Sequence, residues 1–177
     1  VKNAEALAMA RLITDPAART HGLRYEIPDV AVELDADEHG LGSFVSTISG
    51  FLAHDVGIWV TGAGAEALCA RAHVEDARIR VGPVPDRIRR RTRFVVTVTG
   101  RPVLPAQGVA DLVQACGQPG VAEVHVGGDS AAVVCRASWA LHRQARWRRP
   151  MNFGVTQRFS GAQFGMTAGD AEPDLSW

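Results

Sequence analysis

The sequence lacks the patterns that indicate a metal site, a disulfide framework or a membrane span. Its three cysteines, Cys69, Cys116 and Cys135, have no CxxC spacing, so neither a zinc site nor a disulfide framework is expected. The six histidines have no metal-type spacing with one another, and we predict no metal site. No apolar run approaches the length of about 20 residues that a membrane helix needs. The first residues also lack the hydrophobic region of a signal peptide, so we expect a cytoplasmic protein without membrane contact.

Catalytic signatures are absent as well. No Gly-x-Ser-x-Gly motif of serine hydrolases occurs. Asp35, Asp37 and Glu38 beside His39 fit a solvated turn better than a buried pair of catalytic acids. The stretch 62–64, Gly-Ala-Gly, could cradle a phosphate with its N–H groups, but such a short motif is more often a plain strand-to-helix turn. The sequence therefore assigns no catalytic residue, and it leaves open whether the protein is an enzyme.

Lysine is almost absent, since Lys2 is the only one among 19 basic residues. The net charge of zero hides an asymmetry, because residues 1–86 hold 13 acids and 7 bases, whereas residues 87–177 hold 12 bases and 6 acids. A basic face of this kind could meet an acidic protein or nucleic acid, or it could face the acidic half of the same chain. The candidate residues form two clusters, Arg87, Arg89, Arg90, Arg91 and Arg93 in one and Arg143, Arg146, Trp147, Arg148 and Arg149 in the other.

Hydrophobic periodicity predicts alternating strands and helices. Residues 43–48 fit either the second strand of a hairpin or a helix, and residues 81–93 are expected to form a loop rich in proline and arginine. The predicted strands are 30–34, 56–61, 78–80 and 94–103, the predicted helices are 3–14, 65–73, 105–116 and 139–149, and the predicted hairpins are 121–137 and 153–167.

No linker divides the chain, so its 177 residues are interpreted as a single domain. Residues 1–29 would be an N-terminal helix and lead-in, residues 30–137 the core, and residues 138–177 a basic helix followed by a hairpin and a tail. An internal repeat is an alternative organisation. Residues 56–72 superpose without a gap on residues 121–137, which would make the fold a tandem β-α-β-β repeat.

Several short motifs between residues 30 and 104 resemble the flavin-binding split barrel, the pyridoxamine-phosphate-oxidase-like superfamily. Residues 30–40 are similar to its first strand and acidic turn, and residues 56–61 to its inner strand. Residues 65–80 are similar to its helix and the strand entry that follows. Residues 82–89 and 95–102, Gly-Pro-Val-Pro-Asp-Arg-Ile-Arg and Val-Val-Thr-Val-Thr-Gly-Arg-Pro, are similar to its loop and its long strand.

The resemblance implies an α+β fold, a small and mostly antiparallel β-barrel with flanking helices. It also implies a homodimer that binds FMN or a related flavin at its interface, with haem as a second choice. A single histidine could ligate the haem iron, but His125 lies within an apolar strand and fits a core or edge histidine better. The implied cofactor-binding residues are Trp59, Thr61, Arg71, Arg78 and Arg80. Their alternative interpretation is a core tryptophan and solvated arginines.

Two functions therefore stay open at this point. The first is a split-barrel cofactor-binding protein, either a flavin-dependent oxidoreductase or a degenerate relative. The second is a non-catalytic structural or interaction subunit of a larger assembly, which would use its basic C-terminal half to bind an acidic partner or nucleic acid.

Overall fold

The protein is described from a computed structural model, which covers residues 27–72, 76–141 and 154–169. Within these ranges, no helix combines the length and the hydrophobicity that a membrane crossing requires. The elements follow one another as β1 (Val30–Asp35), η1 (Ala36–Glu38), α3 (Leu41–Leu52), β2 (Val56–Thr61), α4 (Ala65–Arg71), β3 (Ile79–Val81), α5 (Asp86–Arg91), β4 (Phe94–Thr99), β5 (Pro102–Val103), α6 (Ala106–Cys116), β6 (Val121–Gly127), β7 (Ala132–Ala137), β8 (Val155–Phe159), η2 (Gly161–Phe164) and β9 (Thr167–Ala168).

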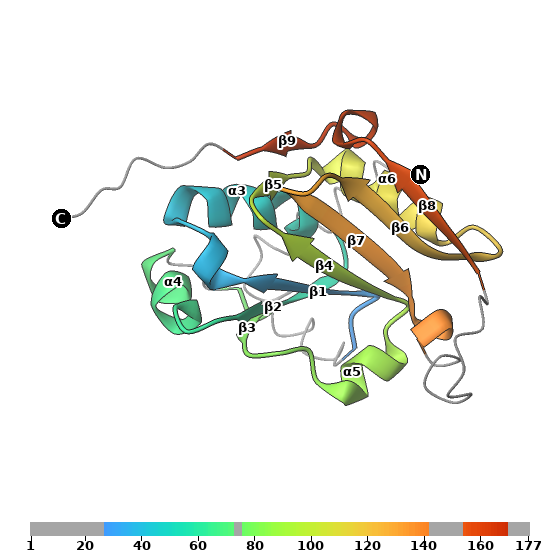
Figure 1. Cartoon of the computed structure of the whole chain (residues 1–177). Helices are drawn as coiled ribbons and strands as arrows, with labels where there is room; N and C mark the ends of the chain where they lie inside the picture. Colours follow the sequence, from blue (N-terminus) through green and yellow to red (C-terminus); the bar gives the residue numbers. More distant parts are fainter. Residues whose placement is uncertain (1–26, 73–75, 142–153, 170–177) are drawn as a thin grey trace.

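One large sheet organises the molecule (Figure 1). Its seven strands lie in the order β3-β2-β1-β4-β7-β6-β8. The first four run parallel to one another, and β8 runs parallel to β6. Only β7 is antiparallel to its neighbours, β4 and β6. Parallel neighbours need crossover connections, which α3, α4 and α5 supply between β1 and β4.

The two faces of the sheet are covered differently. Val32, Ile58 and Val96 point to one face and are fully buried in the main core, which includes Phe44 of α3 and Leu112 of α6. Their neighbours in sequence point to the other face, where a smaller cluster packs Ala31 and Trp59 against Val84 and α5. Beyond α5, this second face carries polar side chains on β4, β6 and β7. We call it the open face (Figure 1).

The predicted split barrel is wrong, because the sheet is open and mainly parallel and the fold is α/β. Alternating strands look the same in sequence whether they pair parallel or antiparallel, so the local pattern could not decide between the two. The tandem repeat is wrong as well. The superposed halves differ in structure, since residues 65–71 form α4 and residues 132–137 form β7.

The helices and strands predicted from the sequence agree with the structure better than the predicted architecture does. The strands at 56–61 and 94–99, the helix 106–116 and the antiparallel hairpin of β6 and β7 are confirmed. Residues 43–48 belong to a helix, α3, and residues 86–91 form the helix α5 instead of a loop. The long strand ends at Thr99. The last hairpin is wrong, because β8 pairs in parallel with β6 and β9 pairs with β5.

Two predicted helices fall wholly or partly outside the described residues. The helix 3–14 lies outside them entirely, and so does most of the basic helix, of which residues 138–141 are described as helical. The division of the chain into lead-in, core and C-terminal segment stays a prediction. Strand β8 comes from the C-terminal segment and lies in the same sheet as the core strands.

Candidate functional site

The carboxyl ends of β1, β2 and β4 meet at one edge of the sheet. Helix α3, which follows β1, packs on one face of the sheet, and α5, which precedes β4, packs on the other. The order in which strands are added to the sheet therefore reverses between β1 and β4, which makes this a topological switch point. Ligands of open α/β sheets bind outside the carboxyl ends of the strands at such a switch point. The charged residues here are named the carboxyl-edge cluster and comprise Asp35, Asp37, Glu38, His39 and Arg101.

The two aspartates organise the turn after β1. Asp35 caps the short helix η1, since its Oδ1 accepts a hydrogen bond from Asp37 N at 2.9 Å. The carboxylate of Asp37 reaches the loop after β2, where it accepts from Ala63 N at 3.1 Å and Gly64 N at 2.9 Å. The Gly-Ala-Gly loop therefore does hold an anion with its N–H groups, but the anion is a side chain of the same protein.

Glu38 joins the same turn to the end of β4. Its Oε2 accepts from Gly100 N at 2.8 Å, and its carbonyl oxygen accepts from Arg101 Nε at 2.7 Å. Gly100 has a φ of 69°, and a side chain there would place Cβ 2.1 Å from Ser130 O. The turn after β4 thus needs glycine, and it lies against the turn between β6 and β7. No described residue bonds the terminal nitrogens of Arg101.

The imidazole of His39 lies in the cluster with no described hydrogen-bond partner. Its ring meets Phe44 edge-on, with centroids 6.3 Å apart, and both ring nitrogens are buried. Burial lowers the pKa of His39, the negative charge of Glu38 opposes this change, and Arg101 adds to it. The imidazole is therefore held in its neutral form near neutral pH, with one lone pair and one N–H that no described residue bonds.

Acidification is expected to destabilise the protein through His39. Because the pKa of this group is lower in the folded chain, the unfolded state binds more protons below about pH 6.5, and stability is lost there. The free energy of unfolding of the wild type should then fall more between about pH 7.5 and pH 5.5 than that of His39→Gln. Urea denaturation at both pH values measures the difference, and an equal loss in the two proteins would contradict the assignment.

The residues assigned to flavin binding are not brought together as one site. Trp59 is buried under Arg80, whose guanidinium carbon lies 5.5 Å from the ring centroid. Thr61 lies at the carboxyl end of β2, where its hydroxyl donates to Leu34 O at 3.1 Å. Arg71 is exposed at the end of α4, and Arg78 lies at the other end of β2, before β3.

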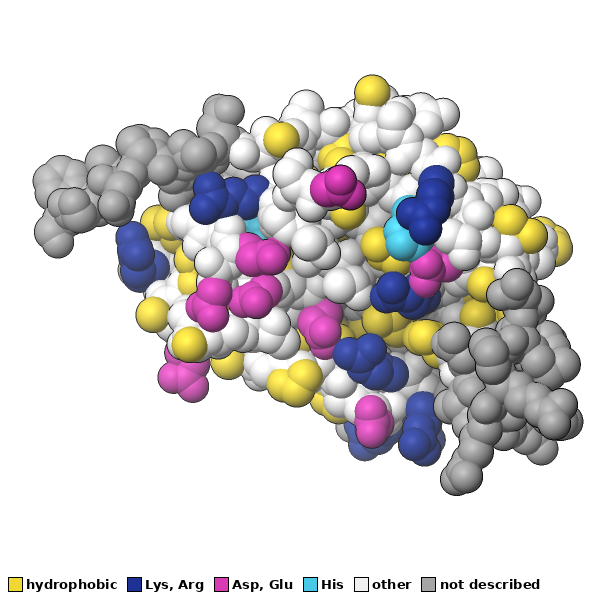
Figure 2. Space-filling view, viewed as in Figure 1, with side chains coloured by type: hydrophobic (Ala, Val, Ile, Leu, Met, Phe, Trp, Pro, Cys, Tyr) yellow, Lys and Arg dark blue, Asp and Glu magenta, His cyan; other side chains and the backbone are white. Residues whose placement is uncertain are grey.

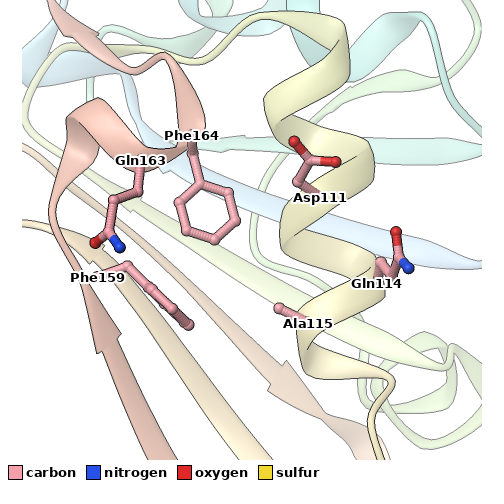
Figure 3. Close-up of a pocket in the computed structure, with 6 residues that line it drawn as sticks. All are labelled: Asp111, Gln114, Ala115, Phe159, Gln163 and Phe164. Carbon is pink, nitrogen blue, oxygen red and sulfur yellow. The ribbon is translucent and has the colours of Figure 1, made fainter.

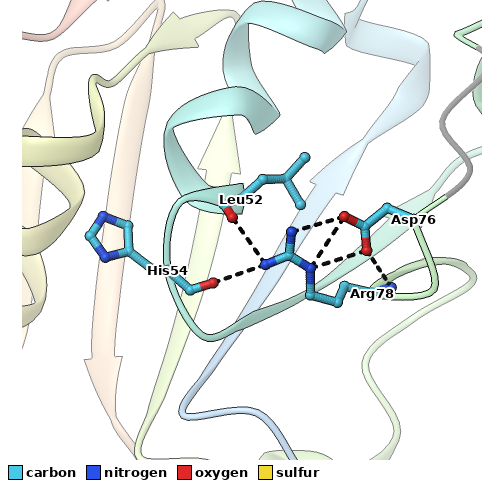
Figure 4. Close-up of polar contacts among 4 residues, drawn as sticks. All are labelled: Leu52, His54, Asp76 and Arg78. Atoms are coloured by element: carbon cyan, nitrogen blue, oxygen red, sulfur yellow. Dashed lines mark hydrogen bonds and ion pairs between the residues drawn. The ribbon is translucent and has the colours of Figure 1, made fainter. Parts of the chain in front are cut away.

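Arg78 takes part in a network that joins three segments (Figure 4). Its guanidinium donates to Leu52 O and His54 O, both at 3.0 Å, and forms an ion pair with Asp76 at 2.8 Å. These carbonyls lie at the end of α3 and in the turn before β2. The arginine therefore fastens the amino edge of the sheet, far along β2 from the carboxyl-edge cluster.

Two of the arginines assigned to an acidic partner or nucleic acid face acids of the same chain. Arg89 pairs with Glu33 at 2.9 Å, and Arg93 pairs with Asp29 at 3.4 Å. Glu33 also accepts from Val84 N, so it fixes the loop before α5. Of the remaining candidates, Arg87, Arg90 and Arg91 lie on or at the end of α5, and Arg143, Arg146, Trp147, Arg148 and Arg149 lie outside the described residues.

The sequence interpretation missed a second charged group, on the open face. Glu123 and His125 of β6 lie beside Arg136 of β7, and the carboxylate contacts both of the other side chains. We name these three residues the sheet-face triad. The predicted hairpin contained the signal, because its register places Arg136 directly opposite Glu123. Figure 2 shows acidic side chains gathered on one side of the open face and a group of both charges with a histidine on the other.

An open groove of about 400 Å³ lies between α6 and η2. Phe159 and Phe164 face α6 across it, with their rings edge-to-face and 5.1 Å apart (Figure 3). Its single charged lining residue, Asp111, accepts a hydrogen bond from Gln107. Among the described residues, no group of three or more histidine, cysteine or acidic side chains is arranged to hold a metal ion.

No family model matches the chain, and no curated protein matches it. Among the solved structures that match, two superpose on part of the chain as follows. A cytidylyltransferase from Leptospira borgpetersenii superposes with a TM-score of 0.47 at 10% identity, over 74% of each chain. A protein from Desulfovibrio desulfuricans, named as a nucleotide-diphospho-sugar transferase, superposes with a TM-score of 0.46 at 8% identity, over 76% of this chain and 80% of that chain.

The resemblance to the flavin split barrel is wrong, because the sheet is open and mainly parallel. The flavin-dependent oxidoreductase is wrong with it, because that function depended on a barrel that the chain does not form. The alternative of a structural subunit with a basic binding half is not supported either, since Arg89 and Arg93 are paired within the chain. The homo-oligomer and the cytoplasmic location stay predictions.

Proposed function

We propose that the chain binds a small molecule rich in hydroxyl groups, of the sugar or nucleoside class, at the carboxyl edge where β1 and β4 end. The topology supports this location, because the switch point between these strands is where open α/β sheets receive ligands. Sugars and nucleosides carry neighbouring hydroxyls that both donate and accept hydrogen bonds. A site for them needs acceptors and donors close together.

One observation carries the proposal: polar atoms without a described partner converge in the carboxyl-edge cluster. Asp35 uses Oδ1 for the η1 cap and Glu38 uses Oε2 for Gly100, so one oxygen of each carboxylate is left for a hydroxyl donor. The terminal nitrogens of Arg101 are available as donors. The ring nitrogens of His39 also lack a described partner, but they are buried.

The balance of charge decides between ligand classes. Three carboxylates face one guanidinium in the cluster, and a neutral His39 adds no charge. A ligand recognised mainly through phosphate would be repelled by this excess of negative charge. Hydroxyl groups instead form charge-assisted hydrogen bonds with the carboxylates, which are stronger than those between neutral groups. The arrangement therefore supports recognition of the sugar part of a ligand.

Isothermal titration of the full chain with a panel of ligands tests the proposal. The panel contains free nucleosides, simple sugars, a cytidine nucleotide and a nucleotide-diphospho-sugar, with inorganic phosphate as the non-hydroxylated compound. We expect at least one sugar-containing member to bind, and Asp35→Asn to weaken it about fivefold or more, because a charged acceptor becomes neutral while the amide oxygen keeps the cap.

The matched control is Glu66→Gln, which removes one carboxylate from the exposed surface of α4. Its affinity should equal that of the wild type. Two results would overturn the proposal. One is that no sugar-containing member binds, and the other is that Asp35→Asn and Glu66→Gln weaken binding equally.

A further inference from the structure

The sheet-face triad lies apart from the carboxyl-edge cluster, in the body of β6 and β7. Its side chains share the open face because they alternate with Val124, Val126 and Cys135, which are buried in the main core. Glu123 and His125 are two residues apart on β6. Arg136 on β7 is the register partner of Glu123, so the three side chains are neighbours on one surface.

Both oxygens of Glu123 are used within the triad. His125 Nε2 contacts Oε1, and Arg136 Nε donates to Oε2. Partial burial raises the pKa of Glu123, but the hydrogen bonds from His125 and Arg136 outweigh it and the net pKa lies below the usual range. The ionised carboxylate therefore holds the imidazole by Nε2 and leaves Nδ1 without a described partner.

Arg158 places a second arginine next to His125 in the sheet. It lies on the edge strand β8 as the register partner of His125, and its side chain is exposed. No described residue forms an ion pair with it. Arg136 makes one further contact, from Nη1 to Thr97 Oγ1 at 3.5 Å, which leaves its Nη2 without a described partner. Two guanidiniums thus stand against one carboxylate, with one positive charge in excess.

We propose that the sheet-face triad and Arg158 bind a phosphate group. Neighbouring strands lie about 4.8 Å apart and alternate residues about 6.8 Å apart, so the side chains of Arg136, His125 and Arg158 can approach one tetrahedral anion from three sides. Val134, the register partner of His125 on β7 and two residues from Arg136, is buried beside these side chains and lowers the polarity of the surface there. Glu123 is a positioning residue that orients Arg136, which donates to the anion, and His125, whose Nδ1 can accept a hydrogen bond from a P–OH group.

Titration of the full chain with inorganic phosphate, followed by NMR on the imidazole signals, tests this site. The His125 signals are assigned by their loss in His125→Gln. We expect them to move with a dissociation constant on the order of 1 mM, as for an open site with few donors. A parallel titration with methyl phosphate shows whether the site prefers a phosphate ester or free phosphate. Equal or tighter binding of methyl phosphate indicates a phosphate ester, and weaker binding indicates free phosphate.

Arg158→Ala should weaken phosphate binding about five- to tenfold, because it removes one charged donor from an exposed strand without disturbing the core. Arg71→Ala removes an equally exposed arginine from α4 and should leave the affinity within about twofold of the wild type. The proposal is overturned if the His125 signals stay in place at a phosphate concentration ten times the expected dissociation constant. It is also overturned if Arg158→Ala and Arg71→Ala bind phosphate equally well.

Discussion

Gly50→Ala is expected to unfold or severely destabilise the protein, although alanine is the better helix former. Gly50 lies inside α3, where the helix crosses the chain after β5, and an added Cβ would stand 1.9 Å from Leu104 O. Thr47, one turn earlier, already bonds Pro102 O at 2.8 Å and holds the two segments together. The clash is with backbone, so the helix itself must move, and we expect a loss of about 4 kcal/mol or more in the free energy of unfolding.

Gly128→Ala is the matched control, because a Cβ at this position meets nothing within 4 Å. Its free energy of unfolding should stay within about 0.5 kcal/mol of the wild type. Urea denaturation of both variants measures the difference. In an ordinary helix interior, glycine to alanine stabilises by about 1 kcal/mol. A neutral or stabilising Gly50→Ala would therefore contradict the close packing of α3 on the segment after β5.

Arg78→Ala is expected to cost about 2 to 4 kcal/mol of the free energy of unfolding. The side chain is about one-quarter exposed and supplies two hydrogen bonds to backbone carbonyls besides its ion pair with Asp76. Its removal leaves these partly buried acceptors and the carboxylate without their donor. Arg78→Lys should recover only part of the loss, since one ammonium cannot reproduce the planar fork of donors.

Arg71→Ala serves again as the control, because Arg71 is exposed on α4. Its replacement should change the free energy of unfolding by no more than about 0.5 kcal/mol. Thermal and urea denaturation of the three variants separate the two roles that Arg78 was considered for. A surface arginine reserved for a cofactor would behave like Arg71, and that result would contradict the structural network.

The sequence indicated most local elements but not the way they assemble. The apolar run from Val56 to Val60 could only be a buried strand, and the turn-forming residues 127–130 fixed the hairpin of β6 and β7. Such short apolar runs have the same sequence pattern in parallel and in antiparallel sheets, so the pattern was equally compatible with a barrel. Pro85 was interpreted as part of a loop, whereas it precedes the first residue of α5.

The candidate sites were less predictable than the strands, because their contacts join residues far apart in the chain. Asp37 and Glu38 were interpreted as a solvated turn, and their partners, Gly64 and Gly100, lie 27 and 62 residues away. Arg101 gave no signal of its own beyond its charge. Only the pairing of Glu123 with Arg136 was within reach of sequence reasoning, because the two lie opposite each other in a hairpin that was predicted.

A crystal structure of the full chain with a sugar-containing ligand from the panel would test the central claim most directly. The account predicts that hydroxyl groups of the ligand contact Asp35 and Glu38 at the carboxyl edge between β1 and β4, with Arg101 within hydrogen-bond distance. A ligand seated in the groove between α6 and η2, or anywhere that leaves both carboxylates untouched, would contradict it.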